Sequence, residues 1–165
     1  MSEGEGPWES ATAVRADNGE LDRTLRGLLQ QVPSSRLGDR PQEEEWNLAQ
    51  NLAHLGEFPA FFAQELKVIL SAAEEDLQVG RTHDHPDRNL AIDSASDQDL
   101  DQLKDAIDSA LDQLARVLES LQDDDLTRVI TNRKYGPEPL KDYLKRYILG
   151  HKRAHVDQLS RALRA

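Results

Sequence analysis

The fold is decided most clearly by one stretch of this 165-residue chain, LKDYLKRYILGHKRAHVDQLSRA at residues 140–162. Apolar residues recur there every three or four positions, which is the period of an amphipathic α-helix that packs against a core. Two histidines, His151 and His155, fall inside the same stripe and lie one helical turn apart. The stripe comprises Leu140, Leu144, Ile148, His151, His155, Leu159 and Ala162. We therefore predict a long final helix that begins near Glu138 and carries two imidazoles on its core-facing side.

Three earlier segments show the same helical period. They are expected at about residues 18–32, 45–73 and 96–122. Pro59 lies inside the second segment and should bend that helix, because proline removes a backbone donor and crowds the preceding turn. No segment shows a strand pattern. Together with the final helix, these segments predict an all-α protein with the architecture of a four-helix bundle.

The domain organisation is expected to be simple. Residues 1–17 are polar and acidic without helical period, which indicates a flexible N-terminal tail. Residues 18–165 are then one domain, a length that suffices for a single core. Residues 74–95 are polar and contain His83 and His85, so we expect a long loop there, with a short helical turn as an alternative. The His-x-His pair of this loop is more simply solvated than bound to metal.

Composition excludes several classes of function. The formal net charge is −11, with 20 basic and 31 acidic residues, and nucleic-acid binding needs a basic surface. The chain has no cysteine, so disulfides and protein thiolates are excluded, and any thiol chemistry must use an external thiol. No N-terminal apolar run resembles a signal peptide, and no apolar stretch is long enough to cross a bilayer. We expect a soluble cytoplasmic protein without nucleic-acid or membrane partners.

A third histidine, His54, lies in the second predicted helix. Three imidazoles from two helices can hold one metal ion and leave coordination positions open, as catalytic zinc sites do. A metal would also satisfy imidazoles that face a core, where unpartnered polar groups are costly. The alternative is that His54, His151 and His155 are ordinary interior histidines bonded to water or carboxylates. Lys152 follows His151 where the metalloprotease motif has glutamate, so that motif is absent.

Glu57 follows His54 by three residues and therefore lies one turn further along the same helix. Three roles are open for its carboxylate: a hydrogen-bond partner of a ligand histidine, a general base, or an exposed surface charge. Basic residues also gather around the start of the final helix, where they either balance the acidic helices or favour an anionic small molecule.

Two segments resemble the DinB-like family. The sequence EWNLAQNLAHL at residues 45–55 resembles the Trp…His-Leu helix of that family. The sequence HKRAHVDQL at residues 151–159 resembles its closing His-x-x-x-His…Gln-Leu helix, and Tyr135-Gly136 before the last helix also fits. The likeness extends over roughly residues 18–163.

This resemblance implies an up-up-down-down bundle with a long crossover, often as a homodimer. It also implies that His54, His151 and His155 ligate one divalent ion, typically zinc or nickel, with water in the open positions. Some relatives transfer low-molecular-weight thiols such as mycothiol or bacillithiol, or isomerise maleylpyruvate with a thiol. Many other relatives have no assigned activity.

The leading hypothesis is therefore a metal-dependent thiol S-transferase that acts on a small-molecule substrate with an external thiol. Glu57 or Tyr135 is expected to assist proton transfer. The anionic thiol is expected to be held by Arg133, Lys134 or Arg153. A metal-dependent hydrolase that uses bound water is a variant of the same site. The competing hypothesis is a non-catalytic, stress-linked module for metal binding or dimerisation.

Overall fold

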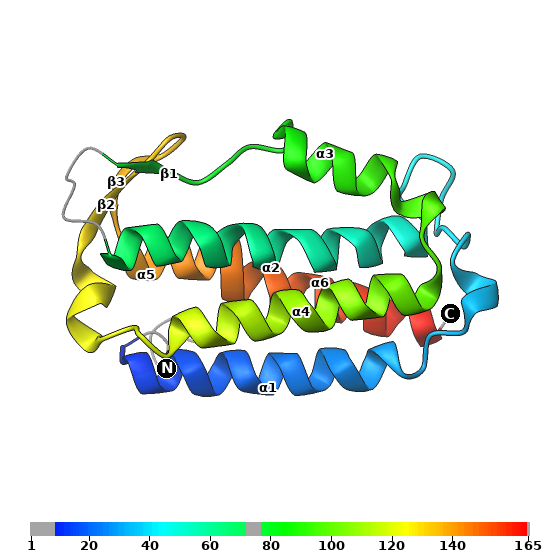
Figure 1. The fold of residues 1–165 in the computed structure, drawn as a ribbon, viewed down its shortest axis with the longest axis horizontal. Helices are drawn as coiled ribbons and strands as arrows, with labels where there is room; N and C mark the ends of the chain where they lie inside the picture. Colours follow the sequence, from blue (N-terminus) through cyan, green and yellow to red (C-terminus); the bar gives the residue numbers. More distant parts are fainter. Residues whose placement is uncertain (1–8, 72–76, 165) are drawn as a thin grey trace.

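The computed structural model describes residues 9–71 and 77–164. Within them, four long helical rods pack side by side as a bundle, which confirms the all-α prediction (Figure 1). The first three rods are α1 (Ala11–Leu29), α2 (Leu48–Ser71) and α4 (Leu100–Leu118). The fourth is continuous but has three parts: α5 (Leu140–Tyr143), the π-helical segment η5 (Leu144–Leu149) and α6 (Gly150–Arg164).

The order of helix directions differs from the one implied by the family resemblance. Arg15 of α1 bonds to the carbonyl of Leu118 near the end of α4, so these two helices are antiparallel. α2 and α4 run in the same direction, opposite to α1 and α6 (Figure 1). The order is therefore up-down-down-up. The reason is that a loop at one end of the bundle joins α1 directly to α2, which leaves a single long crossover between α2 and α4.

α1 begins at Ala11, earlier than the predicted start at residue 18. The hydroxyl of Ser10 caps the helix by accepting a hydrogen bond from the backbone N–H of Ala13. Ala11 and Val14 are buried in the core, so part of the segment assigned to a tail is a packed helix. Asn18, at the predicted start, lies buried inside α1.

Two other helix boundaries have local causes. α4 begins at Leu100 because Asp99 forms a capping box with Gln102, whereas Ser96 lies in the preceding 3₁₀ turn, η3 (Ala95–Asp97). Pro59 lies within α2, which continues on both sides of it. Two further 3₁₀ turns are η2 (Ser34–Arg36) and η4 (Asp123–Thr127).

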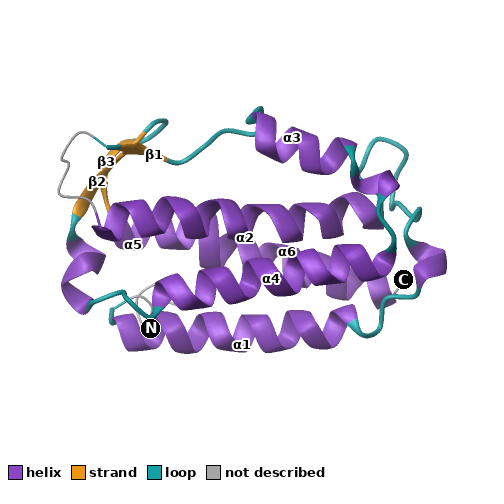
Figure 2. Ribbon diagram, in the orientation of Figure 1, coloured by secondary structure: helices purple, strands orange, loops and turns teal. Residues whose placement is uncertain are grey.

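A small three-stranded sheet at one end of the bundle corrects the expectation of no strands (Figure 2). Its strands are β1 (Gln78–Val79), β2 (Val129–Asn132) and β3 (Gly136–Pro139). β2 pairs in parallel with β1 and antiparallel with β3. Strands of two to four residues are too short to show an alternating period, which explains why the sequence pattern missed them.

The polar segment 74–95 contains ordered structure in its described part. After β1, the chain forms the eight-residue helix α3 (Pro86–Asp93), which lies along the outside of the bundle against α2 (Figure 1). The ring of His85 caps α3 by accepting from the backbone N–H of Asp87, and His83 is exposed. Neither histidine joins the three-histidine cluster described below.

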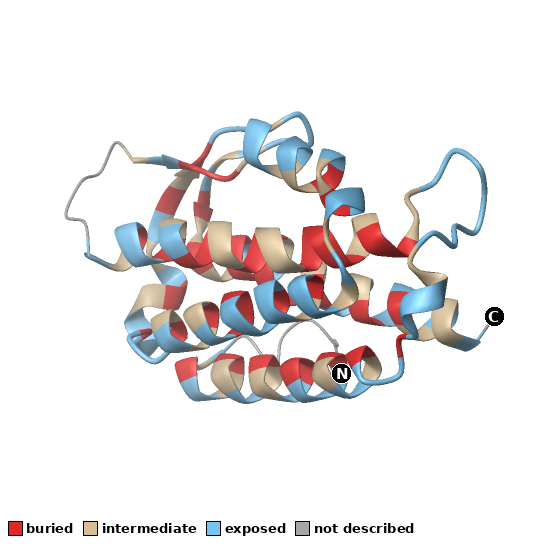
Figure 3. Ribbon diagram, turned by 45° about the vertical axis from the view of Figure 1, so that its right-hand side comes forward, coloured by how far each residue is buried: buried red, intermediate tan, exposed pale blue. Residues whose placement is uncertain are grey.

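The core lies between the four rods, and the buried residues occupy their inward faces (Figure 3). Leucine is its commonest residue. Lys152 of α6 is an exception, because its side chain is fully buried. None of the helices in the described part of the chain is long and apolar enough to cross a membrane.

Candidate metal centre

The three histidines singled out from the sequence meet in the structure. His54 comes from the second turn of α2, and His151 and His155 come from the first turns of α6. Nε2 of His151 lies 3.2 Å from Nε2 of His54 and 3.0 Å from Nε2 of His155. One ligand atom from each of the three lies within 4.8 Å of the other two. The arrangement can therefore hold a single metal ion.

The environment keeps these imidazoles neutral. Burial, together with the charges of the neighbouring imidazoles, lowers the pKa of His54 from its usual 6.5 to about 2. Burial likewise lowers the pKa of His151 to about 3 and that of His155 to about 4. A neutral imidazole is the form that ligates a metal, so all three side chains are ready to bind at neutral pH.

The rings of His151 and His155 are each oriented by a further hydrogen bond from the ring nitrogen that does not face the other histidines. The backbone carbonyl of Tyr147 accepts from the ring of His151, and the side chain of Gln158 accepts from the ring of His155. Phe58 stacks on His151 with ring centroids 4.1 Å apart. These contacts direct the remaining nitrogen of each ring toward the common centre, as carbonyls and amides do for ligand histidines in metal sites.

His54 differs, because its Nδ1 is buried without a hydrogen-bond partner among the described residues. Asn51 lies one turn earlier on α2, and its Oδ1 is the other buried side-chain atom without a partner there. If Nε2 of His54 binds the metal, its Nδ1 carries a proton and is a hydrogen-bond donor, whereas Oδ1 of Asn51 is an acceptor. Asn51 is therefore a candidate for the part that Tyr147 and Gln158 play for the other rings.

A metal ion fits this donor set better than hydrogen bonding does. If the outer nitrogens of His151 and His155 carry the protons, both Nε2 atoms present lone pairs only 3.0 Å apart. Zn–N bonds of about 2.0–2.1 Å in a tetrahedral site place ligand nitrogens about 3.3 Å apart. The observed separations of 3.0 and 3.2 Å are close to that spacing. Imidazole ligands suit zinc, nickel, copper and iron, so the donor set leaves the choice of metal open.

The three histidines lie at a cavity of about 840 Å³. Its walls are aromatic and cationic, and Asp84 is the one carboxylate among the described residues that line it. The aromatic residues of the wall are Trp46, Phe62, Tyr135 and Tyr147. The cationic residues are Arg81, Arg88, Lys134 and Arg146. In an otherwise acidic protein, this cavity is a local site of positive charge and is suited to an anionic ligand.

Two of these arginines are held in place by carboxylates and rings. Nη1 of Arg81 donates to Oε2 of Glu57 at 2.7 Å, and its guanidinium carbon lies 4.2 Å from the centre of the Phe61 ring. Nη1 of Arg146 donates to both carboxylate oxygens of Glu138, at 2.6 and 2.8 Å. Such contacts fix a guanidinium before a ligand arrives, which reduces the entropy lost on binding.

The residues predicted to take part in chemistry fall into two groups. Tyr135 and Lys134 line the cavity at the histidines. Arg153 is half-exposed and pairs with Asp17 of α1, and it is not among the residues of that wall. Arg133 donates to the carbonyl of Gly80 and lies near Glu65.

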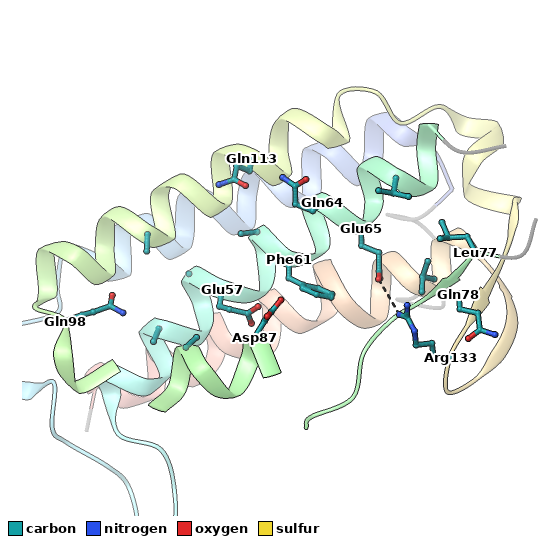
Figure 4. Close-up of a pocket in the computed structure, with 17 residues that line it drawn as sticks. Glu57, Phe61, Gln64, Glu65, Leu77, Gln78, Asp87, Gln98, Gln113 and Arg133 are labelled. Atoms are coloured by element: carbon teal, nitrogen blue, oxygen red, sulfur yellow. Dashed lines mark ion pairs between the residues drawn. The ribbon is translucent and has the colours of Figure 1, made fainter. Parts of the chain in front are cut away.

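Glu57 and Arg133 both line a second cavity, of about 840 Å³, on another side of α2 (Figure 4). Its floor is apolar and is formed by α2, α3 and α4, and Arg133 and Glu65 close one end of it (Figure 4). Glu57 is therefore not a neighbour of the cavity at the histidines, but reaches it through Arg81.

Arg81 and Arg88 carry no sequence signal that marks them as residues of the site. Both lie in the segment treated as a loop, and only β1 and α3 bring them over the histidines. Arg146 appeared only as one member of a basic group. Nothing in the local pattern distinguishes it, because its position depends on Glu138 in β3.

Comparison with known proteins agrees with this geometry. The family model of the DinB superfamily matches residues 20–159. Among solved structures, an uncharacterised protein of Clostridium difficile 630 aligns with a TM-score of 0.66 at 12% identity, covering 93% of this chain and 95% of that one. A protein of Streptococcus pneumoniae aligns with a TM-score of 0.63 at 13% identity, covering 93% and 91%.

A third solved structure is the mycothiol-dependent maleylpyruvate isomerase, with a TM-score of 0.66 at 16% identity. The alignment covers 88% of this chain but only 57% of the isomerase chain. No curated protein matches the sequence. At these identities the structural matches establish a shared fold.

Proposed function

The chain belongs to the DinB superfamily, and from that premise we propose that it binds one divalent metal ion through His54, His151 and His155 for thiol transfer. The observation that carries the proposal is the convergence of three neutral imidazoles at a cavity. Zinc and nickel are the expected ions. The reaction is the transfer of an external low-molecular-weight thiol to an electrophilic small molecule.

A bound divalent ion would supply Lewis acidity, which lowers the pKa of a thiol and makes its sulfur nucleophilic near neutral pH. Three protein ligands leave positions free for such a group, as in catalytic rather than structural zinc sites. The chain contains no cysteine, so the thiol has to come from outside. The isomerase of similar fold depends on the thiol mycothiol, which supports this choice of reaction over others.

The proposal gives the anion-binding role to Lys134 together with Arg81, Arg88 and Arg146. These four cations line the cavity, whereas the charges of Arg133 and Arg153 are directed to partners elsewhere. Bacillithiol, coenzyme A and cysteine carry carboxylates or phosphates, and guanidinium groups bind such groups in two-point contacts. The aromatic walls exclude water from the apolar part of the substrate.

Tyr135 is the proposed proton carrier. Its side chain is half-exposed in the cavity wall, and the guanidinium of Arg146 lies 4.0 Å from the centre of its ring. Its hydroxyl lies in the wall of the same cavity as the histidines, where it can donate a proton to a departing group. Glu57 acts in this proposal through Arg81, although direct proton transfer by its carboxylate remains the alternative.

Hydrolysis by metal-bound water is the second candidate, because the same open site would serve it. A module without turnover is disfavoured by a cavity of about 840 Å³ beside the ligands. We also expect a homodimer, which sedimentation equilibrium would test.

The test is turnover with defined reagents. Zinc-loaded and nickel-loaded protein would be mixed with monochlorobimane and, in turn, mycothiol, bacillithiol, coenzyme A or cysteine. The thiol sulfur forms a bond to carbon, chloride leaves and the thiol proton passes to solvent, so fluorescence reports the product. Rate acceleration that requires the metal and one of these thiols supports the proposal. A metal-loaded protein that hydrolyses activated esters but conjugates no thiol would overturn it in favour of the hydrolase.

A further inference from the structure

The helix that carries His151 and His155 is interrupted by a π-helical segment immediately before them. η5 spans Leu144–Leu149, and the N–H of Gly150 donates to the carbonyl of Lys145, five residues earlier. An α-helix would bond to the residue four positions back, so η5 accommodates one extra residue. Such insertions are uncommon, and in proteins they are often found at functional sites.

An extra residue changes which side chains face the core. Because an α-helix turns about 100° per residue, one inserted residue sets the following helix back by about 100°. An uninterrupted helix would place His151 and His155 in the centre of the apolar stripe, as the sequence pattern predicts. In the structure they are only half-buried, and the buried positions of α6 are those of Lys152, Val156 and Leu159. Lys152 and Val156 each follow a histidine of the predicted stripe by one residue, which is the shift expected from a setback of that size.

Gly150 is the residue that permits the insertion. A Cβ at this position would lie 2.4 Å from the backbone oxygen of Lys145. That oxygen belongs to the main chain and cannot move away without disturbing η5. Any other residue at position 150 therefore disfavours the π-helical segment and favours a regular α-helix.

The rotated position of α6 is secured by a buried charge. Nζ of Lys152 donates to Oδ1 of Asp22 at 2.6 Å and also to the side chain of Asn18, both on α1. A lysine is rarely found fully buried, and a buried ion pair fixes one arrangement of helices more than it stabilises the fold. Without the setback, Lys152 would turn away from α1 and both acceptors would lose the ammonium group as a partner, leaving Asp22 only the amide of Asn18 among the described residues.

We propose that η5, permitted by Gly150 and secured by Lys152 against Asp22, sets the rotation of α6 that directs His151 and His155 out of the core toward His54. Gly150 and Lys152 are thus positioning residues for the metal site, and this step rests on the metal-binding function proposed above. Each residue of the sequence Gly-His-Lys at positions 150–152 then has its own role. Gly150 permits the inserted residue, His151 is a metal ligand and Lys152 fixes the rotation of α6.

Two variants test the proposal. Gly150→Ala should remove η5 and turn α6, so zinc affinity measured against a chromogenic chelator should fall at least tenfold. Adding deletion of the exposed Lys145 to Gly150→Ala removes the extra residue, so a regular α-helix would restore the original rotation. This double variant should bind zinc within about threefold of the unmodified protein. Gly27→Ala is the matched control, because no atom lies within 4 Å of its added Cβ.

A second measurement does not depend on metal. In the presence of chelator, Lys152 should resist acetylation by acetic anhydride relative to the exposed Lys67, as read by peptide mass spectrometry. It should become reactive in Gly150→Ala and protected again in the double variant. If Gly150→Ala fails to fold, the double variant still tests the proposal. The proposal requires that this variant folds, protects Lys152 from acetylation and binds zinc.

Unchanged zinc affinity and unchanged Lys152 protection in Gly150→Ala would overturn the proposal, as would a double variant that recovers neither. Absence of zinc binding in the unmodified protein would instead overturn the metal function. The acetylation pattern would then still report whether η5 sets the rotation of α6, so the two failures are distinguishable.

Discussion

Glu57 and Arg81 form an ion pair that lies between the two cavities of the protein, with Oε2 of Glu57 accepting from Nη1 of Arg81 at 2.7 Å. Glu57 belongs to the wall of the apolar cavity and Arg81 to the wall of the cavity at the histidines. Both side chains are largely buried, with 15% and 4% of their surfaces exposed. The carboxylate therefore serves mainly to hold a cation in the site and to balance its charge.

The first prediction concerns Glu57→Gln. Removal of one member of a buried pair leaves an uncompensated charge and should lower the free energy of unfolding by about 3 kcal/mol, measured by urea denaturation. Because Arg81 loses its fixed orientation, KM for an anionic thiol should rise with little change in kcat. Asp17→Asn is the control, since the Asp17–Arg153 pair is partly exposed and should contribute less than about 1 kcal/mol. A large fall in kcat with KM unchanged would instead make Glu57 a general base.

The second prediction concerns the ligands themselves. Protein purified without an affinity tag should contain about one zinc or nickel ion per chain by elemental analysis, since three imidazoles supply one site. His151→Ala and His155→Ala should each abolish this content. His83→Ala should retain it, because His83 is exposed and lies outside the cluster. Full metal content in either ligand variant would show that the assigned residues do not hold the ion.

The histidine cluster was predictable because its signal is local. A spacing of four residues places His151 and His155 on adjacent turns whatever the tertiary structure, and the apolar period around His54 identifies its helix. The spacing between these two histidines is unaffected by the insertion at η5, since both follow it and rotate together. The sequence could not predict that rotation, because a π-helical segment follows from contacts across i and i+5 that no apolar period encodes.

The cationic wall of the cavity was not predictable for a different reason. Arg81 follows a two-residue strand whose partner, β2, begins about fifty positions later in the chain. Pairing at that distance depends on the assembled bundle, so neither the strand nor the position of Arg81 has a local signature. The beginning of α1 was missed because the polar, buried Asn18 interrupts the apolar stripe that Ala11 and Val14 continue at helical spacing.

The third prediction concerns Asn51. Its Oδ1 and Nδ1 of His54 are both buried without partners among the described residues, and they lie one turn apart on α2. When Nε2 of His54 binds a metal, Nδ1 carries a proton that the amide oxygen can accept. Asn51→Leu should therefore weaken zinc binding about 10- to 100-fold, the usual effect of losing the partner of a ligand histidine.

Asn51→Asp is the companion variant, because a carboxylate can still accept that proton. It should bind zinc at least as tightly as the unmodified protein in a competition assay with a chelator. Equal affinities for Asn51→Leu and Asn51→Asp would contradict a role for the amide oxygen.

The fourth prediction concerns the charge of the cavity. Arg88→Gln and Lys134→Gln should each raise KM for an anionic thiol several-fold while kcat and zinc content stay within twofold, because both residues contact the cavity but not the histidine nitrogens. The effect should diminish at high ionic strength, where charge interactions are screened. Thiol kinetics at low and at 0.5 M salt would measure it. Lys67→Gln, on the exposed face of α2, is the control.

The fifth prediction concerns stability against pH in the presence of a chelator. In the folded protein, burial holds the pKa values of His54, His151 and His155 at about 2, 3 and 4, whereas in the unfolded chain they return to about 6.5. Between these limits the unfolded chain binds more protons, so acid favours unfolding. The histidine contribution is complete above pH 6.5 and is lost as the pH falls from there through the folded pKa values of about 4, 3 and 2. Each histidine that stays neutral in the folded protein should add up to about 1.4 kcal/mol per pH unit to the slope of the unfolding free energy against pH.

Urea denaturation between pH 7 and pH 5 would measure this slope, and His54→Leu should reduce it by about one third, because one of three depressed groups is removed. His83→Gln is the control and should leave the slope unchanged, since its ring is exposed. An identical slope in His54→Leu and the unmodified protein would mean that the buried imidazoles are not held neutral. The readiness of the site for a metal at neutral pH would then need another explanation, because a protonated imidazole has no lone pair to donate.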